Sequence, residues 1–330
     1  MPIWKRIEDE GAGYIYSLSE SLAIVDWRHP DFLRSVSNGE MVIASDYSGQ
    51  HKGASHEAYS FLVTTRAVLD HWQGVCEQFR SQWLPDGRRI SFKQLREPVR
   101  RRSLPFFLDI ASAIRGNVIT FLVDRRIKSF IDDGPATIPD AFPDCFPRGT
   151  KLGTMEKMLR LASFLAMLTA GLRQEDQRSL WISDHDETLD SFNKREGFGR
   201  LGHYLTFAFS RWMKPADLEF GTTESPYAPT WAEDACAIPD LIAGACGRLS
   251  GKLPAFYRQE HWISHVQTDD VQDRRAIIVG NWMARANTPL RQVLLRLELD
   301  DNGSIRTSAE FFVGAIPSGR ANTSEVKDIR

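Results

Sequence analysis

The sequence predicts an α/β fold, and two observations lead to this prediction. Short β-rich runs alternate along the chain with segments in which apolar residues recur every three or four positions, the spacing of an amphipathic helix. In addition, residues 118–123 include four β-branched residues and are apolar on both faces, as is typical of a strand covered on both sides. We therefore expect a sheet flanked by helices.

The first half of the chain is expected to begin with an extension that packs on the main domain. Two β-rich runs at 41–49 and 58–65, separated by a polar turn, then predict a β-hairpin. The elements expected after the hairpin are a helix at 66–84, an extended segment at 89–95, a helix at 103–114 and the central strand at 118–123.

The second half alternates helices and strands until its character changes after residue 260. The elements expected here are a loop at 130–149, helices at 155–172, 202–213 and 231–249, and strands at 179–183 and 218–223. Strand-like runs follow at 276–279, 290–299 and 308–313, with a turn signal at Asp300-Asp301-Asn302-Gly303. The sequence thus predicts an N-terminal extension at 1–40, a main domain at 41–260 and a small C-terminal β appendage at 261–330.

Composition and charge exclude several classes of protein. No window approaches the roughly 18 uninterrupted apolar residues of a membrane span, and the N-terminus lacks the apolar core of a secretion signal, so we expect a cytoplasmic protein without membrane contact. The four cysteines include no Cys-x-x-Cys pair, which argues against a disulfide scaffold or a zinc ribbon. The formal net charge of −2 argues against binding nucleic acid through overall positive charge, although a local basic patch would suffice.

Acidic residues follow three of the predicted strands, and another lies in the late apolar helix. They are Asp46 after the first run, Asp124 after the central strand, Asp184, Asp186 and Glu187 after the strand at 179–183, and Asp240 in the helix. If the acid-bearing strands lie side by side, these carboxylates converge, and a divalent cation would neutralise their mutual repulsion. Hard oxygen ligands favour Mg²⁺ or Mn²⁺, and a pair of such ions can activate water for phosphodiester hydrolysis.

Each acid also has a simpler structural explanation. Asp46 would cap the hairpin turn, Asp124 would pair with Arg125 or Arg126, and the acids from 184 to 187 would cap the next segment. Asp240 would be a solvated or hydrogen-bonded helix residue. On the sequence alone, both explanations stay open for every acid.

Four stretches, which together span residues 41–250, carry a resemblance to a known family. They are Asp46-Tyr47-Ser48-Gly49 at a strand end, Phe61-Leu62-Val63 in the next strand, Ile90-Ser91-Phe92-Lys93-Gln94-Leu95 before a helix, and Ile238-Pro239-Asp240-Leu241-Ile242-Ala243-Gly244-Ala245. The chain resembles the bacterial and phage proteins grouped as domain of unknown function 3800, which look like members of the ribonuclease H-like superfamily. That family typically shows Asp-Glu-Ser-Gly at the first stretch and a sequence close to Ala-Asp-Leu-Ile-Ala-Gly at the last. Tyr47 therefore replaces a Glu, and Pro239 replaces an Ala.

The resemblance implies both a fold and an activity. The fold is a ribonuclease H-like mixed sheet flanked by helices, and the activity is that of a divalent-metal-dependent nuclease or phosphodiesterase, in phage defence or another mobile-element context. By this match Asp46 and Asp240 would bind Mg²⁺ or Mn²⁺. Asp124 and Asp186, with Asp184 as the substitute and Glu187 in reserve, would complete the catalytic set by their position at strand ends. The alternative is a catalytically degenerate scaffold whose C-terminal β appendage contacts a protein partner or a second copy.

A basic run supports a phosphate-bearing ligand. Seven arginines and lysines lie between residues 88 and 102 against one acid, Glu97, and three more follow the central strand. The residues expected to contact a nucleic-acid backbone are Lys93, Arg100, Arg101, Arg102, Arg125 and Arg126. The alternative for this run is a solvated helix face.

Overall fold

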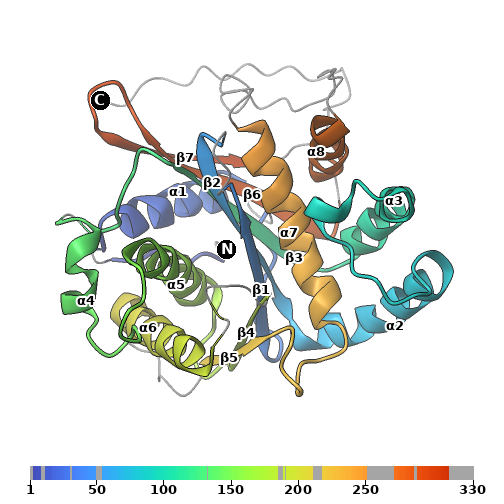
Figure 1. The fold of residues 1–330 in the computed structure, drawn as a ribbon, viewed down its shortest axis with the longest axis horizontal. Coiled ribbons are helices and arrows are strands. Elements are labelled where there is room, and N and C mark those ends of the chain that lie inside the picture. The colour runs from blue at the N-terminus through green and yellow to red at the C-terminus, as the bar shows by residue number, and fades with distance from the viewer. Residues whose placement is uncertain are drawn as a thin grey trace.

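A mixed sheet of seven strands, flanked by helices on both faces, organises the part of the chain that the structure describes (Figure 1). The computed structural model describes residues 3–8, 12–29, 32–49, 54–131, 133–184, 189, 191–210, 218–250, 271–285 and 288–311. The predicted α/β fold class is confirmed. None of the helices within these ranges is both long and apolar enough to cross a membrane.

The strands of the sheet follow the order β5-β4-β1-β2-β3-β6-β7. Their bounds are β1 Met41–Ser48, β2 His56–Thr65, β3 Gly116–Asp124, β4 Ser179–Ser183, β5 Leu218–Thr222, β6 Leu290–Leu299 and β7 Ile305–Phe311. The pairs β1/β2, β2/β3 and β6/β7 are antiparallel, whereas β1/β4, β4/β5 and β3/β6 are parallel. Only β2 and β7 among these seven run against the rest, so the C-terminal ends of β1, β3, β4 and β5 lie along one edge of the sheet.

The helices form a layer on each face of the sheet, and each layer has its own apolar core (Figure 1). One layer contains α2 (Arg66–Trp83), α3 (Pro98–Ser112), α7 (Ala232–Leu249) and α8 (Val271–Met283). The other contains α1 (Tyr14–Arg28), α5 (Leu152–Leu172) and α6 (Phe192–Ser210). Short helical turns lie at η2 (Phe92–Gln94), η3 (Pro135–Thr137) and α4 (Ile138–Ala141).

Strand β1 distributes its side chains between these two layers. Val42 and Ala44 belong to the core beneath α7, whereas Met41 and Ile43 belong to the core beneath α5. Successive side chains of a strand point to opposite faces, so Asp46 faces the α7 layer. Tyr47 packs against the α5 layer.

The two ends of the chain are both tied to this sheet. Trp4, Leu18 and Leu22 from the predicted N-terminal extension are buried in the α5-side core. At the other end, β6 pairs with the central strand β3, so the strands expected in a C-terminal β appendage extend the main sheet instead. The division of the chain at residues 40 and 260 stays a prediction.

Some local predictions were wrong: the loop expected at 130–149 contains η3 and α4. Residues 276–279, expected as a strand, lie inside helix α8. The segment 89–95, expected to be extended, contains the helical turn η2.

Candidate functional site

The candidate site lies where β1 and β4 end beneath helix α7. Asp46 is near the end of β1, opposite Ser60 of β2, and its side chain is partly buried. The backbone N–H of Tyr47 donates to its Oδ1 at 2.6 Å. Asp46 therefore reaches the edge of the sheet on the α7 side, as its position at the strand end predicts.

Asp184 follows β4 directly and becomes the neighbour of Asp46. Ser45 and Ser183 are in register in the parallel pair β1/β4. The residues that follow them, Asp46 and Asp184, therefore lie on the same side of the sheet. Two donors hold Asp184: Thr223 Oγ1 donates to its Oδ1 at 2.8 Å, and Arg89 Nη1 lies 3.2 Å from the same oxygen.

Asp240 approaches these strand ends from helix α7. The backbone N–H of Phe92 donates to its Oδ2 at 2.6 Å, and the Ser91 side chain adds a further hydrogen bond. Burial raises the pKa of Asp240 to about 6, and the charge of Asp184 adds to this rise, while the hydrogen bonds and the charge of Lys93 oppose it. The charge of Asp184 therefore reaches the carboxyl group of Asp240.

Glycines let α7 come close to the segments that carry these acids. A Cβ built at Gly244 would lie 2.3 Å from Cγ of Phe92, a distance that no real side chain tolerates. One turn further, a Cβ at Gly247 would lie 3.5 Å from the backbone nitrogen of Gly49, which follows β1. The small residues of α7 therefore fix its distance from both η2 and the end of β1.

Cys236, one turn before Asp240, lies near the other two acids. Its Sγ donates to the carbonyl oxygen of Ile182 in β4 at 3.8 Å. Burial raises the pKa of the Cys236 thiol far above its usual range, and the charges of Asp184 and Asp46 raise it further. Asp46, Asp184 and Asp240 thus lie on the α7 side of this sheet edge. We call these three residues the acid cluster.

The structure does not bring Asp124 into the acid cluster. It ends β3, four residues beyond Thr120, which is in register with Ser60 and through it with Asp46. Arg126 donates to its Oδ2 from Nε at 2.8 Å. Burial alone would raise the pKa of Asp124, but the hydrogen bonds from Arg126 and the backbone outweigh it and lower the pKa. Asp124 thus takes the alternative role of an ion-pair partner.

The remaining predicted acids, Asp186 and Glu187, lie outside the described residues. Within the described ranges, no group of three or more His, Cys, Asp or Glu side chains has an arrangement that would hold a metal ion. The donors of the acid cluster are nevertheless hard carboxylate oxygens, the type that suits Mg²⁺ or Mn²⁺. The cluster fits these ions in donor chemistry, and the hydrogen bonds to Asp184 and Asp240 hold these two carboxylates in their present positions.

The predicted nucleic-acid-binding residues differ in their contacts. Lys93, Arg101, Arg102 and Arg126 are exposed, and the charge of Lys93 acts on Asp240. Arg102 donates to the carbonyl oxygen of Pro98 at 3.3 Å, and three others also bind within the protein. Arg100 donates to the carbonyl oxygen of Arg89 at 2.5 Å, Arg125 donates to Ala54 at 3.3 Å, and Arg126 is held by Asp124.

Two residues of the site, Arg89 and Thr223, were not predicted as part of it. Arg89 binds both Asp184 and Glu233, the latter at 2.7 Å, and Thr223 supports Asp184. The available signals were the basic run that contains Arg89 and the strand end that contains Thr223. Neither signal predicts that the residue binds Asp184. Their roles depend on the pairing of β4 with β5 and on the packing of segment 89–95 beside α7.

Tyr47 does not take the place of a missing ligand. It lies on the opposite side of the sheet from the acid cluster, where Lys157 Nζ is 3.9 Å from the centre of its ring. This contact is a cation–π interaction within the α5 layer.

Comparisons with known proteins found no relative of the chain. No family model matches the chain, and no curated protein matches it.

Proposed function

We propose that the chain is a ribonuclease H-like, divalent-metal-dependent phosphodiester hydrolase that acts on nucleic acid. The observation that carries this proposal is the acid cluster, three carboxylates from β1, β4 and α7 on one side of one sheet edge. The strand order β3-β2-β1-β4-β5, in which β2 alone runs against the others, agrees with the ribonuclease H-like arrangement that the resemblance implies. A context of phage defence or mobile elements rests on the resemblance to domain of unknown function 3800.

Asp46 and Asp240 would hold Mg²⁺ or Mn²⁺, and Asp184 would become the third ligand if the carboxylates moved from their present positions, because no three of the described side chains are now arranged to hold an ion. The bound ions would supply an activated water and stabilise the leaving oxygen. Residues of the chain support this chemistry: the N–H of Phe92 and the Ser91 hydroxyl orient Asp240, and Thr223 orients Asp184. Lys93, exposed beside Asp240, would attract a backbone phosphate.

The alternative function is a non-catalytic scaffold, and one observation favours it. Asp184 already has a cationic partner, because Arg89 bridges it to Glu233. An arginine in this position neutralises the charge that a metal ion would otherwise compensate. In a scaffold, β6 and β7 at the far edge of the sheet would contact a protein partner or a second copy.

Substitution of the acid cluster tests the enzymatic proposal. We expect Asp46→Asn and Asp240→Asn each to weaken Mn²⁺ binding at least tenfold in calorimetry and to abolish Mn²⁺-dependent cleavage of labelled DNA or RNA. The reason is that each variant replaces a charged ligand with a neutral one while keeping its shape. Asp140→Asn, an exposed acid in α4, is the matched control and should bind and cleave as the wild type does.

Two results would contradict the enzymatic proposal. If both variants bind Mn²⁺ and cleave nucleic acid as the wild type does, the acid cluster is not the catalytic site. If the wild type neither binds Mn²⁺ nor cleaves any of these substrates, the scaffold is the better description.

A further inference from the structure

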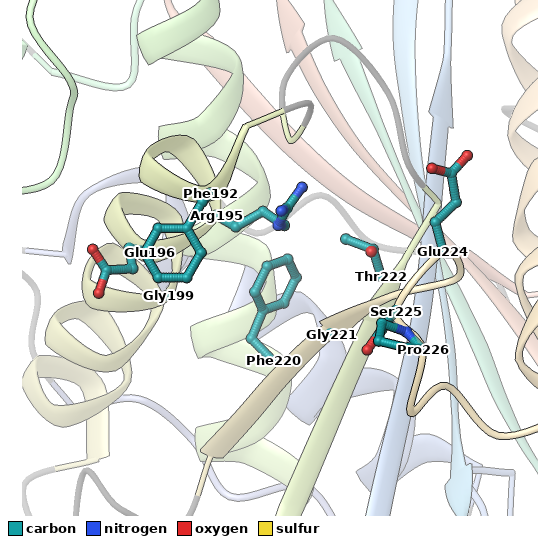
Figure 2. A pocket seen from close by; sticks show the side chains of 10 residues that line it. All are labelled: Phe192, Arg195, Glu196, Gly199, Phe220, Gly221, Thr222, Glu224, Ser225 and Pro226. Atoms are coloured by element: carbon teal, nitrogen blue, oxygen red, sulfur yellow. The ribbon is translucent and has the colours of Figure 1, made fainter.

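A cavity of about 610 Å³ lies between helix α6 and strand β5, on the side of the sheet opposite to the acid cluster. This volume falls in the range of roughly 300–1,000 Å³ that is typical of small-molecule sites. Figure 2 shows the side chains of Arg195 and Phe220 extending into the space between α6 and β5, with Phe192 on the helix beside them.

Two phenylalanines give this cavity aromatic surfaces. Phe220 of β5 is held in place by Trp181, at 4.7 Å between ring centres, and by Phe198, at 5.6 Å. Phe192 begins α6, and 66% of it is exposed, although it lines a cavity. A rigid ring in the wall and an exposed ring at the rim are suited to contact a flat aromatic ligand.

Arg195 adds a positive charge to the same cavity. Its Nη1 donates to the carbonyl oxygen of Leu189 at 2.9 Å, which fixes the direction of the side chain. A guanidinium has five N–H donors, so this bond leaves donors for an anionic group. The ligand that matches this lining is an aromatic ring attached to an anion.

The carboxylates at the rim do not oppose an anionic ligand as strongly as their number suggests. Glu196 lies 3.9 Å from Arg200 on the same helix, and Glu224 interacts with Arg89. Both carboxylates thus have cationic neighbours. They can also accept hydrogen bonds from the amino groups of a base.

The end of β5 connects the cavity to the acid cluster. Thr222 lines the cavity, whereas the next residue, Thr223, donates to Asp184 on the other side of the sheet. Thr222 is the last residue of β5 and Thr223 begins the turn that follows it, so one strand end contacts both places. A strand of nucleic acid that crosses this sheet edge would place a phosphate near the acid cluster and a neighbouring base in the cavity.

We propose that the cavity between α6 and β5 binds one base and its phosphate from single-stranded nucleic acid, with the base on Phe192 and Phe220 and the phosphate at Arg195. This inference rests on the proposed function for its choice of ligand. A base in a duplex cannot enter such a cavity while it remains stacked and paired, which is why a single strand is the matching form.

The test measures binding without metal, so that it does not depend on cleavage. The probes are a fluorescein-labelled twelve-nucleotide oligothymidylate, the corresponding oligouridylate and an abasic strand of the same length, each titrated in EDTA and followed by anisotropy. We expect Phe192→Ala to weaken binding of at least one base-containing strand by about 5- to 150-fold, the range given by loss of one stacked base. The matched control is Phe207→Ala, since Phe207 is also exposed on α6, at 53%, but does not line the cavity.

The abasic strand shows whether the lost contact is to a base. Wild type and Phe192→Ala should bind it equally, and both should bind it more weakly than the wild type binds the strands with bases. The inference is overturned if Phe192→Ala binds every strand as the wild type does, if Phe207→Ala shows the same loss, or if the wild type binds neither base-containing strand. If the Phe192 effect is seen while the acid-cluster variants still cleave or no cleavage occurs, the cavity stands as a nucleotide site and the proposed catalytic function fails.

Discussion

Asp240 is a residue of the acid cluster whose surroundings shift its pKa. Burial beneath η2 raises its pKa to about 6, although Phe92 and Ser91 donate hydrogen bonds to the carboxylate. At pH 7 the carboxylate is therefore charged and suitable as a metal ligand, whereas below about pH 6 it becomes protonated. Ionisation of this carboxyl group therefore lowers the free energy of unfolding when no cation neutralises its charge.

From the raised pKa we predict how the free energy of unfolding depends on pH in the absence of divalent metal. The pKa of Asp240 is raised from 3.8 in the unfolded chain to about 6 in the fold, so the folded state binds the proton more tightly. The stabilising effect of the proton is fully present below pH 3.8 and is lost as the pH rises through about 6. At about 1.4 kcal/mol per pKa unit, the loss is about 3 kcal/mol.

Chemical denaturation at a series of pH values measures this effect. The free energy of unfolding of Asp240→Asn, relative to that of the wild type, should rise by about 2 kcal/mol between pH 4 and pH 7, because a small part of the effect is already lost at pH 4. Asp140→Asn, used again as the control, should show no such rise. Parallel pH profiles for wild type and Asp240→Asn would contradict the raised pKa.

The sequence predicted part of this cluster at the level of single residues. Asp46 and Asp184 could be proposed because both follow a β-rich run, and parallel strands bring such ends together. The same argument proposed Asp124, but an arginine two residues later satisfies that carboxylate locally. A strand end alone does not say whether its acid meets another acid or a base, since that depends on which strands are neighbours.

Helix α7 is the element that makes the site, because it brings Asp240 and Cys236 over the ends of β1 and β4. Its approach to η2 depends on Gly244, which contacts the ring of Phe92. Phe92 in turn holds Asp240 through its backbone N–H. The packing of Gly244 against Phe92 is thus linked to the orientation of the Asp240 carboxylate.

A single methyl group should disturb this contact. We expect Gly244→Ala to lower the free energy of unfolding by about 1–3 kcal/mol, because its Cβ would lie 2.3 Å from the Phe92 ring. Gly74→Ala is the control: no atom lies within 4 Å of the added Cβ in α2, so it should leave stability unchanged or raise it by up to about 1 kcal/mol. Equal stability of Gly244→Ala and the wild type would show that η2 moves aside without cost.

Other elements show where local sequence patterns mislead. Residues Ala276-Ile277-Ile278-Val279 are β-rich, yet in α8 the buried apolar side chains are those of Ala276, Val279, Trp282 and Met283. That spacing of three and four is helical, and packing of α8 on α7 outweighs the β preference of two isoleucines and a valine. Helix α6 likewise begins at Phe192, ten residues before the predicted start.

At the scale of the whole molecule, the sheet joins segments that lie far apart in the sequence. The hairpin of β1 and β2, the central strand β3 and the short strand β4 follow from local patterns, and all four lie where the sequence predicts them. The pairing of β3 with β6 joins residues about 170 positions apart, and no local signal indicates it. The strands after residue 260 therefore looked like a separate appendage.

The most direct test of the proposed function is to locate Mn²⁺ in a crystal of the wild-type protein soaked at pH 7.5, using anomalous scattering. The proposal predicts a peak at the ends of β1 and β4, within coordination distance of carboxylate oxygens of both Asp46 and Asp240. At this pH Asp240 is ionised, so its protonation does not compete with the ion. A map with no peak at the acid cluster, or with Mn²⁺ bound only elsewhere, would contradict a metal-dependent hydrolase built on these three aspartates.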